Sequence, residues 1–241
     1  MKNLKKITLL FFAFLFLAET KAQIFNEPLQ KYANSVVDEF EQIPVKRKKT
    51  LYKISHNLYE EWKVKLIAQP LFVCTNNSRR SQTAQVWFAV ASLYYGVPNL
   101  TSFSGGSKET AFNIRAVEAL RRAGIQIKKT DSSNTENPVY TTTLMDKYQL
   151  DSYSKKCDDP KNPKTDFIAI MLCSDKDPSC PKVENANALF YLPFEDPRYE
   201  DHTASETKTY DNTCREIARE MLYVVSRMKA RFVLDNEKKR K

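Results

Sequence analysis

The sequence predicts an α/β domain with a doubly wound, four-stranded parallel sheet and helices on both faces. Apolar stretches of strand length alternate along the chain with stretches of helical periodicity. The strongest stretch is apolar throughout, from Phe167 to Leu172, and a polar loop joins the first predicted strand to a helix. Strands that are apolar throughout are typical of a parallel sheet covered on both faces. A chain of 241 residues can form one such domain with extensions.

The first residues have the order of a secretory signal. Several lysines precede an apolar run from Ile7 to Ala18, and the short segment Thr20-Lys21-Ala22 follows. The run is too short to span a bilayer comfortably. We therefore expect residues 1–22 to be a cleaved signal peptide, so that the mature protein is periplasmic or secreted, with no stable membrane insertion.

The remaining chain divides by composition into three parts. Residues 23–63 are polar, with apolar residues at helical spacing on both sides of Pro44, which predicts an N-terminal extension of two helices. Residues 64–233 are predicted to be the main domain, and residues 234–241 a solvated basic tail. The predicted strands of the main domain are residues 64–73, 100–104, 166–173 and 188–192, and its predicted helices are residues 82–95, 110–123 and 205–232.

A long segment inside the main domain has no predicted element. Residues 129–165 are rich in Asn, Ser, Thr, Asp and Pro. Structureless segments of this length inside a domain are uncommon and are usually functional or mobile. We expect an insertion that lies near the active site or moves.

The formal net charge of +9 lies mainly at the two ends of the chain, in the predicted signal peptide and the basic tail. The part that is expected to fold is close to balanced, and it has no glycine-rich nucleotide-binding loop. Nucleic-acid binding is therefore not expected.

The cysteine count is odd. The five cysteines are Cys74, Cys157, Cys173, Cys180 and Cys214. In an oxidising compartment at least one thiol is left over if the others pair internally, as expected when one cysteine is a nucleophile. Cys157 and Cys214 are interpreted as ordinary buried or surface thiols. No histidine lies near the other cysteines in sequence, so no metal site is predicted.

A polar loop from Cys74 to Arg80 joins the first predicted strand to the following helix. Backbone N–H groups and the dipole at a helix N-terminus favour a bound anion and also a thiolate. Arg80 can bind two oxygens of a tetrahedral oxyanion, and Ser81 can donate a hydrogen bond to the sulfur. The predicted oxyanion-binding residues are Thr75, Asn76, Asn77, Ser78, Arg79 and Arg80. The spacing favours Cys74 as a nucleophile over the alternative of a buried cysteine beside a surface arginine.

The loop resembles that of the low-molecular-weight protein tyrosine phosphatases and their relatives, the thioredoxin-coupled arsenate reductases, which usually reads C-x-G-N-x-C-R-S. Here the loop reads C-T-N-N-S-R-R-S, with Asn76 in place of the glycine and Arg79 in place of the second cysteine. The resemblance continues through Ser104-Gly105-Gly106 and covers about residues 65–128 and 166–230. It implies the fold of the low-molecular-weight phosphatases.

The family's general acid is an Asp before Pro late in the domain, and Asp196-Pro197 follows the last predicted strand. The resemblance implies that Asp196 protonates the leaving oxygen and then deprotonates water. A second Asp-Pro pair, Asp159-Pro160, lies in the insertion and is ranked below the first. Without the resemblance, either pair is typical of a turn.

Cys173 and Cys180 stand in a segment that resembles the redox segment of the thioredoxin-coupled arsenate reductases, which tyrosine phosphatases lack. In that mechanism arsenate forms an adduct on Cys74, and Cys173 attacks the Cys74 sulfur to release arsenite. Cys180 then resolves the pair as a Cys173–Cys180 disulfide. The resemblance implies no bound cofactor but an external thiol reductant, with a thioredoxin-like protein as partner.

Several alternatives stay open for the same residues. The Cys173 and Cys180 pair can be a structural disulfide, which an exported location favours. Cys74, Arg80 and Asp196 then suit a phosphatase that hydrolyses phosphate monoesters through a phosphocysteine, with Tyr199 beside an aromatic substrate. A third alternative is a non-catalytic module that binds the oxyanion. The arsenate reductase interpretation is preferred because the cysteine pair is the more specific signal.

Overall fold

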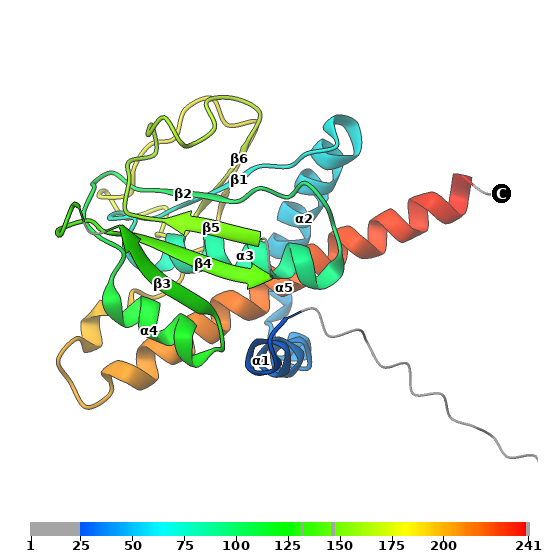
Figure 1. Ribbon diagram of the computed structural model, residues 1–241. Helices are drawn as coiled ribbons and strands as arrows, with labels where there is room; N and C mark the ends of the chain where they lie inside the picture. Colours follow the sequence, from blue (N-terminus) through cyan, green and yellow to red (C-terminus); the bar gives the residue numbers. More distant parts are fainter. Residues whose placement is uncertain (1–24, 132, 146–147, 240–241) are drawn as a thin grey trace, which may run out of the picture.

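The computed structural model describes residues 25–131, 133–145 and 148–239, so the predicted signal peptide, residues 1–22, lies outside the described residues. A four-stranded parallel sheet with the order β2-β1-β6-β7 forms the centre (Figure 1). Its strands are β1 (Pro70–Val73), β2 (Phe103–Gly105), β6 (Ile168–Met171) and β7 (Ala188–Tyr191). This arrangement confirms the predicted doubly wound α/β fold class.

The register aligns the carboxyl ends of the neighbouring strands β2, β1 and β6, because Val73 pairs with both Gly105 and Met171. Side chains alternate between two cores. Phe72 and Ile170 belong to a large core on one face, and Val73 and Met171 belong to a small core on the other. The predicted apolar strand is buried along its whole length, as a central parallel strand requires.

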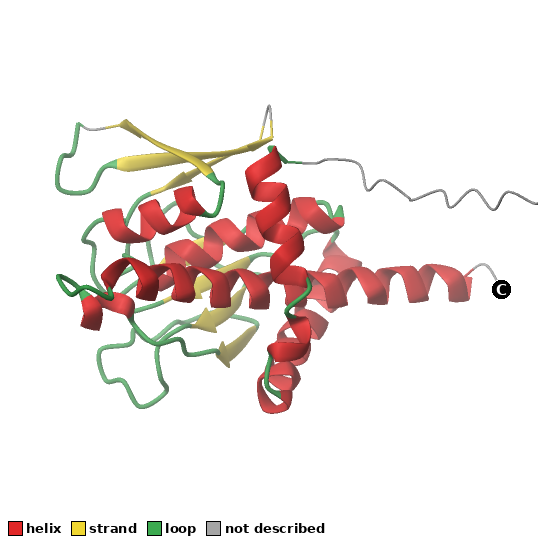
Figure 2. Ribbon diagram, turned by 90° about the horizontal axis from the view of Figure 1, so that it is seen from below, coloured by secondary structure: helices red, strands yellow, loops and turns green. Residues whose placement is uncertain are grey.

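The helices gather with the large core, as Figure 2 shows. They are α1 (Glu27–Val37), α2 (Val45–Lys65), α3 (Arg80–Tyr95), α4 (Ile114–Arg122) and α5 (Glu206–Lys239), with 3₁₀ turns η1 (Phe40–Gln42) and η2 (Pro197–Glu200). Trp87 of α3 is fully buried where α3 packs on α5. The β6–β7 connection carries Cys180 and Val183 onto the small core. It is a loop, because residues 174–185 are too rich in Asp, Ser and Pro to form a helix.

The N-terminal extension has the two predicted helices, α1 and α2, and Pro44 caps the second. The boundary with the main domain differs from the prediction. Val64 and Lys65 belong to the end of α2, which Leu66 terminates in a left-handed conformation with φ 58°. The predicted strand 64–73 is thereby shortened to β1, because Leu58 and Trp62 continue the buried face of the helix up to this point.

The insertion contains regular structure that the sequence analysis missed. Strands β3 (Gln126–Asp131), β4 (Val139–Met145) and β5 (Tyr148–Ser152) form a separate antiparallel sheet in the order β3-β4-β5. Tyr140, Thr142 and Leu144 alternate as the buried residues of β4, and the Tyr140 and Phe112 rings lie 5.9 Å apart. The interpretation of residues 129–165 as a segment without regular elements was therefore wrong.

Helix α5 continues past the predicted end at residue 232 and projects from the body of the molecule (Figures 1 and 2). Its extra turns contact α2. The Asp235 carboxylate accepts hydrogen bonds from Tyr59 Oη and Lys63 Nζ, each at 3.0 Å, and the Phe232 ring packs edge-on against Trp62. The predicted tail is thus helical through Lys239, since these contacts favour continuation of the helix.

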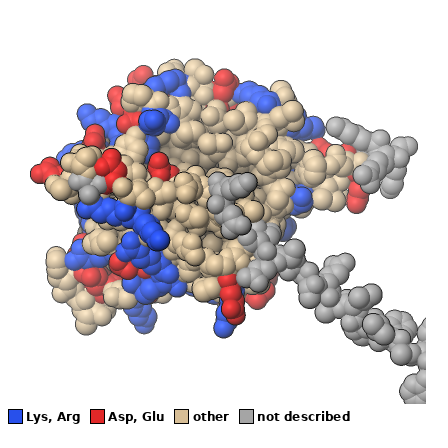
Figure 3. All heavy atoms as spheres, viewed as in Figure 1, with Lys and Arg blue, Asp and Glu red and all other residues tan. Residues whose placement is uncertain are grey.

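Both basic and acidic side chains lie on the face of the molecule that Figure 3 shows. Figure 3 shows basic side chains gathered at the lower left, in the region of β3 and α4, with acidic side chains among them. Lys128 and Lys129 are exposed on β3, while Arg122 of α4 pairs with Asp211 at 2.7 Å. Within the described residues, no helix is long and apolar enough to be a transmembrane span.

Candidate active site

Cys74 lies directly after β1, and Arg80 is the first residue of α3. The Cys74 side chain is buried, and its sulfur lies 3.0 Å from Ser81 Oγ. The Cys74 N–H donates to the Gly105 carbonyl oxygen at 3.2 Å, which fixes the end of the strand. A Cβ on Gly106 would lie 2.7 Å from Asn77 N and 2.9 Å from Cys74 O. Only glycine at position 106 allows the segment after β2 to pack this closely against the backbone of the cysteine loop.

Asn77 is the structural centre of the loop. It is fully buried with φ 44°, a left-handed conformation that Asn adopts more readily than most residues. Its Nδ2 donates to Ser81 Oγ at 2.9 Å, its Oδ1 accepts from Lys155 N at 2.8 Å, and its carbonyl accepts from Gln82 Nε2 at 2.7 Å. Because Ser81 Oγ accepts from Asn77, its hydrogen is free to donate to the Cys74 sulfur, which stabilises a thiolate.

Arg80 is 8% exposed and links the loop to the two neighbouring strand ends. Its Nη1 donates to Leu172 O at 3.1 Å and to Phe194 O at 2.9 Å, and its Nη2 donates to Asp196 Oδ2 at 3.0 Å. Its Nε is buried and has no acceptor within the described part of the chain. A tetrahedral oxyanion in the pocket can supply that acceptor, since a buried unpaired N–H is costly.

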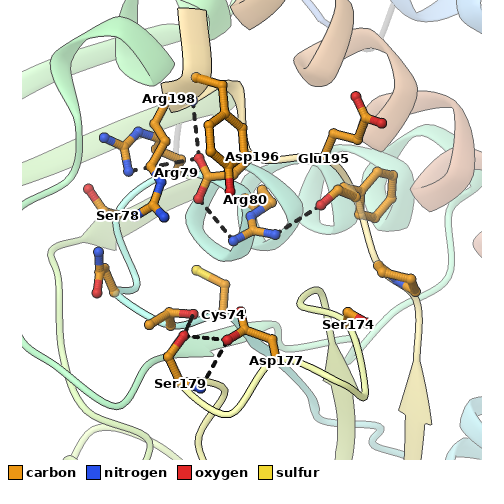
Figure 4. A pocket seen from close by; sticks show the side chains of 15 residues that line it. Cys74, Ser78, Arg79, Arg80, Ser174, Asp177, Ser179, Glu195, Asp196 and Arg198 are labelled. Carbon is orange, nitrogen blue, oxygen red and sulfur yellow. Dashed lines mark hydrogen bonds and ion pairs between the residues drawn. The ribbon is translucent and has the colours of Figure 1, made fainter. Parts of the chain in front are cut away.

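Asp196 reaches the pocket from the side opposite the cysteine loop (Figure 4). Its Oδ1 accepts from Arg198 N at 3.2 Å, which caps η2 at Pro197. Its carboxylate pairs with Arg80 at 3.0 Å and lies 3.9 Å from Arg79. Asp159, the other Asp of an Asp-Pro pair, accepts from Lys161 N and does not line the pocket. The geometry therefore favours Asp196 over Asp159 as the acid.

The pocket has a volume of about 450 Å³ and is walled by three loops. Among the predicted oxyanion-binding residues, the loop contributes Thr75, Asn76, Ser78, Arg79 and Arg80, whereas Asn77 lies beneath it. The Arg79 side chain turns away from the sulfur: its Nε donates to Tyr210 Oη at 2.9 Å, and it pairs with Asp201 at 3.6 Å. Tyr199 is 76% exposed at the rim.

Cys173 and Cys180 form a disulfide with Cα atoms 6.1 Å apart. Cys173 is fully buried in the small core, on the sheet face opposite Cys74, which belongs to the large core. Neither disulfide cysteine lines the pocket, but the chain between them does. Ser179 Oγ lies 3.2 Å from Thr75 Oγ1, and hydrogen bonds from Ser179 hold the pKa of the half-buried Asp177 below its usual range. The disulfide loop thus forms a wall of the pocket.

The two remaining cysteines are thiols of ordinary character. Burial raises the pKa of Cys214 to about 12, and its sulfur accepts from Trp87 Nε1 at 3.2 Å. Burial likewise raises the pKa of Cys157 to about 12. Both stay protonated at neutral pH. The described residues include no group of three or more His, Cys, Asp or Glu side chains placed to bind a metal ion.

The insertion supports the loop through residues that the sequence analysis did not single out. Ser154 Oγ donates to Asn76 O at 3.0 Å, and Lys155 N donates to Asn77 Oδ1. Asn137 in turn accepts from Ser154 N at 3.0 Å. No motif marks Ser154 and Lys155, because the loop atoms to which they donate lie 78 residues away in the chain.

Lys155 predicts a specific pH dependence of stability. Its side chain is 3% exposed with Nζ 4.8 Å from the Tyr153 ring centroid, and burial lowers its pKa from 10.5 to about 8. Between pH 8 and 10.5 the Lys155 side chain therefore holds more protons in the unfolded chain than in the folded protein, so Lys155 contributes a rise with pH to the free energy of unfolding. Cys157 and Cys214, whose pKa values are raised, contribute a fall above pH 9, so the effect of Lys155 is the difference between wild type and a variant. Lys155→Met should remove that rise and add up to about 3 kcal/mol of stability below pH 8.

Urea unfolding at pH 7 and pH 10 measures this effect in the two proteins. The control is Lys156→Met, which replaces the exposed neighbouring lysine and should leave the pH dependence unchanged. The same change in the free energy of unfolding from pH 7 to pH 10 in wild type and Lys155→Met would show that Lys155 does not contribute to the pH dependence.

A cysteine after a strand, an arginine at the next helix start and a facing aspartate define the class of cysteine-dependent oxyanion enzymes. The chain is similar in sequence to arsenate reductases, as the motifs indicated. It is 29% identical to "Arsenate reductase 2" of Staphylococcus haemolyticus over 126 residues, which are 52% of this chain and 76% of that protein. Over the same shares it is 26% identical to the "Arsenate reductase" of Staphylococcus aureus strain Newman. No protein-family model matches the chain.

Solved structures that align with the chain include a low-molecular-weight phosphotyrosine phosphatase from Vibrio cholerae O395, with a TM-score of 0.44 and 15% identity over 66% of this chain and 95% of that one. Another is the thioredoxin-dependent arsenate reductase of Corynebacterium glutamicum, with a TM-score of 0.33 and 17% identity over 80% of this chain and 96% of that one.

Proposed function

We propose that the protein reduces arsenate to arsenite through a relay of three thiols, Cys74, Cys173 and Cys180. The observation that carries the proposal is the disulfide Cys173–Cys180, whose connecting loop walls the pocket above Cys74. The sequence similarity to arsenate reductases supports it. A plain hydrolase needs no second and third thiol near its nucleophile.

In the first step the Cys74 thiolate attacks arsenic(V) and one arsenate oxygen leaves as water. Asp196 faces Cys74 across the pocket and is the group placed to protonate that oxygen. Arg80 and the N–H groups of the loop stabilise the charge on the remaining oxygens. The product of the step is a covalent Cys74–arsenic adduct.

In the second step the Cys173 thiolate attacks the Cys74 sulfur. The electron pair of the sulfur–arsenic bond passes to arsenic, which leaves as arsenite, and a Cys74–Cys173 disulfide forms. The Cys180 thiolate then attacks the Cys173 sulfur and releases Cys74 as a thiolate. The Cys173–Cys180 disulfide that remains is the oxidised end state, and an external dithiol returns two electrons to it.

The relay requires a rearrangement of the disulfide loop. Cys173 lies in the small core, on the other face of the sheet from Cys74, so it reaches the Cys74 sulfur only after residues 173–180 leave their present position. Reduction of the disulfide removes the covalent closure of this loop. Its Asp, Ser and Pro residues form no helix or strand that would oppose the movement.

The same burial of Cys173 favours a second candidate function, a phosphatase with a structural disulfide. In that case Cys74 attacks phosphorus, and Asp196 protonates the ester oxygen and then deprotonates the water that hydrolyses the phosphocysteine. A module that binds an oxyanion without turnover is the third candidate.

We further propose that the enzyme acts outside the cytoplasm, on the basis of the signal-like order of residues 1–22. The disulfide then serves as a redox-active group that an exported, thioredoxin-like dithiol protein reduces. No bound cofactor is required for this chemistry, because the thiols themselves carry the two electrons.

The test is arsenite production from arsenate by residues 23–241 with a dithiol reductant, beside hydrolysis of an aryl phosphate. We expect Cys173→Ser to lose arsenite turnover by at least about 100-fold while any phosphate hydrolysis persists. Cys157→Ser, which removes a protonated thiol near the site, is the matched control and should keep both reactions. Ester hydrolysis that is independent of Cys173, with no arsenite, would establish the phosphatase, and oxyanion binding without either product would establish the binding module.

A further inference from the structure

The segment that carries Asp196 is held between two arginines, Arg80 and Arg47. We name residues 193–197 the acid loop. On the side of the cysteine loop, Arg80 Nη1 donates to Phe194 O at 2.9 Å. On the other side, Arg47 Nη1 donates to Pro193 O at 2.9 Å, and the Arg47 guanidinium lies 4.6 Å from the centroid of the Phe194 ring. Arg47 belongs to α2 of the N-terminal extension, outside the segments that resemble the arsenate reductases.

Arg47 is itself held in a fixed orientation. Its Nε and Nη2 donate to the two carboxylate oxygens of Glu220 at 2.7 and 2.9 Å, and Glu220 on α5 is 2% exposed. This fork geometry fixes the plane of the guanidinium, which leaves Nη1 for the Pro193 carbonyl and one face for the Phe194 ring. The contact is therefore directional as well as electrostatic.

The acid loop has open space on both faces. It forms a wall of the active-site pocket, and it also lines a second cavity of about 590 Å³ to which Arg47 and Glu220 belong. Pro193, Phe194, Glu195 and Asp196 border both cavities. Phe194 is buried in the large core, whereas Glu195 is exposed and Asp196 half-buried, so the position of the Asp196 carboxylate depends on how Phe194 is held and on a few hydrogen bonds. One more of these is the bond from Phe194 N to Leu172 O at 3.2 Å.

We infer that Arg47 is a positioning residue, which holds the acid loop so that the Asp196 carboxylate faces Cys74 and Arg80. The inference rests on the proposed role of Asp196 as the general acid. It gives the N-terminal extension a part in the reaction, because α2 then acts on the active site through Arg47. Removing Arg47 takes away the contacts to Pro193 O and to the Phe194 ring, which allows the acid loop to shift toward the second cavity.

The first test does not depend on turnover. Amide hydrogen exchange of the segment from Pro193 to Pro197 should be at least about tenfold faster in Arg47→Ala than in wild type. The matched control is Arg215→Ala. Arg215 also joins α5 to the extension, with its Nη2 2.7 Å from Glu39 Oε1, but among the described residues its hydrogen bonds go to Glu39 and Ser35 and not to the acid loop. Unchanged exchange in Arg47→Ala, or an equal increase in both variants, would overturn the inference.

The second test is kinetic, with arsenate and with two aryl phosphates, 4-nitrophenyl phosphate and phenyl phosphate. Arg47→Ala should lower kcat about tenfold, and more for phenyl phosphate because its poorer leaving group needs the acid more. In the Asp196→Asn enzyme, the additional change Arg47→Ala should lower the rate by no more than about twofold, since both changes act through the Asp196 carboxyl group. Arg47→Lys should fall between Arg47→Ala and wild type.

The outcomes separate the two proposals. A wild type without turnover on any of these substrates contradicts the proposed function, and the exchange result then decides the positioning role by itself. An active wild type in which Arg47→Ala slows the Asp196→Asn enzyme by the full tenfold contradicts the positioning role and leaves the proposed function standing.

Discussion

Replacing Cys74 with serine should abolish arsenate reduction and ester hydrolysis alike, by about 10,000-fold or more. The Ser81 hydroxyl and the start of α3 stabilise a thiolate, and a serine hydroxyl does not ionise at neutral pH even there. Initial rates of arsenite and phosphate release measure the loss. Phosphate binding should persist within a few fold in calorimetric titration, because the loop amides and Arg80 remain.

Cys214→Ala is the control for the Cys74 experiment. It removes another buried sulfur, one that contacts Trp87 in the large core and not the pocket. Its thermal stability should fall while its rate constants stay near those of the wild type. Activity of Cys74→Ser within tenfold of the wild type would mean that another group is the nucleophile.

Replacing Arg80 with lysine should lower kcat by about 1,000-fold, although the charge is retained. A lysine cannot bind two oxyanion oxygens in parallel while it also donates to Leu172 O, Phe194 O and Asp196. Phe194 O loses its partner and Leu172 O keeps only the bond from Phe194 N, so the free energy of unfolding should fall by about 2 kcal/mol as well. Rate measurements and urea unfolding follow the two effects separately.

Arg122→Lys provides the matched comparison for Arg80→Lys. Arg122 pairs with Asp211 at 2.7 Å on the surface, where both side chains are about 40% exposed, and an exposed pair contributes little to stability. Neither its rate nor its unfolding should change measurably. A wild-type rate in Arg80→Lys would rule out the bidentate role of Arg80.

The sequence was informative about the sheet wherever a pattern is local. The apolar run that became β6 identified a covered parallel strand from six adjacent residues. Strand β4 carries an equally local alternation of Tyr140, Thr142 and Leu144, but the turn-forming residues on both sides of it masked the signal. The helix α2 extends further than predicted, to Lys65. The error arose because the largely apolar run 64–73 covers both the end of the helix and the strand, so the pattern does not mark the boundary.

Cys74, Arg80 and Asp196 could be brought together from the sequence, because the carboxyl ends of neighbouring parallel strands meet at one edge. The placement of Cys173 could not. It depends on the register that pairs Val73 with Met171, and a shift of one residue would turn Cys173 toward the face of Cys74. Arg47 escaped notice for a related reason, since its partners are Glu220 on a distant helix, the Pro193 carbonyl and the Phe194 ring.

The hydrogen bonds around Asn77 and Ser154 have a consequence for selectivity. They come from residues outside the bound anion's reach, so the loop is already ordered before an oxyanion arrives. A rigid cradle of this kind accepts any tetrahedral anion of suitable charge and does not distinguish arsenic from phosphorus. Arsenate and phosphate are then distinguished after binding, by the fate of the covalent adduct on Cys74. Water attacks the central atom and hydrolyses the adduct, whereas a thiol attacks the Cys74 sulfur. The second route requires a central atom that accepts an electron pair, as arsenic(V) does.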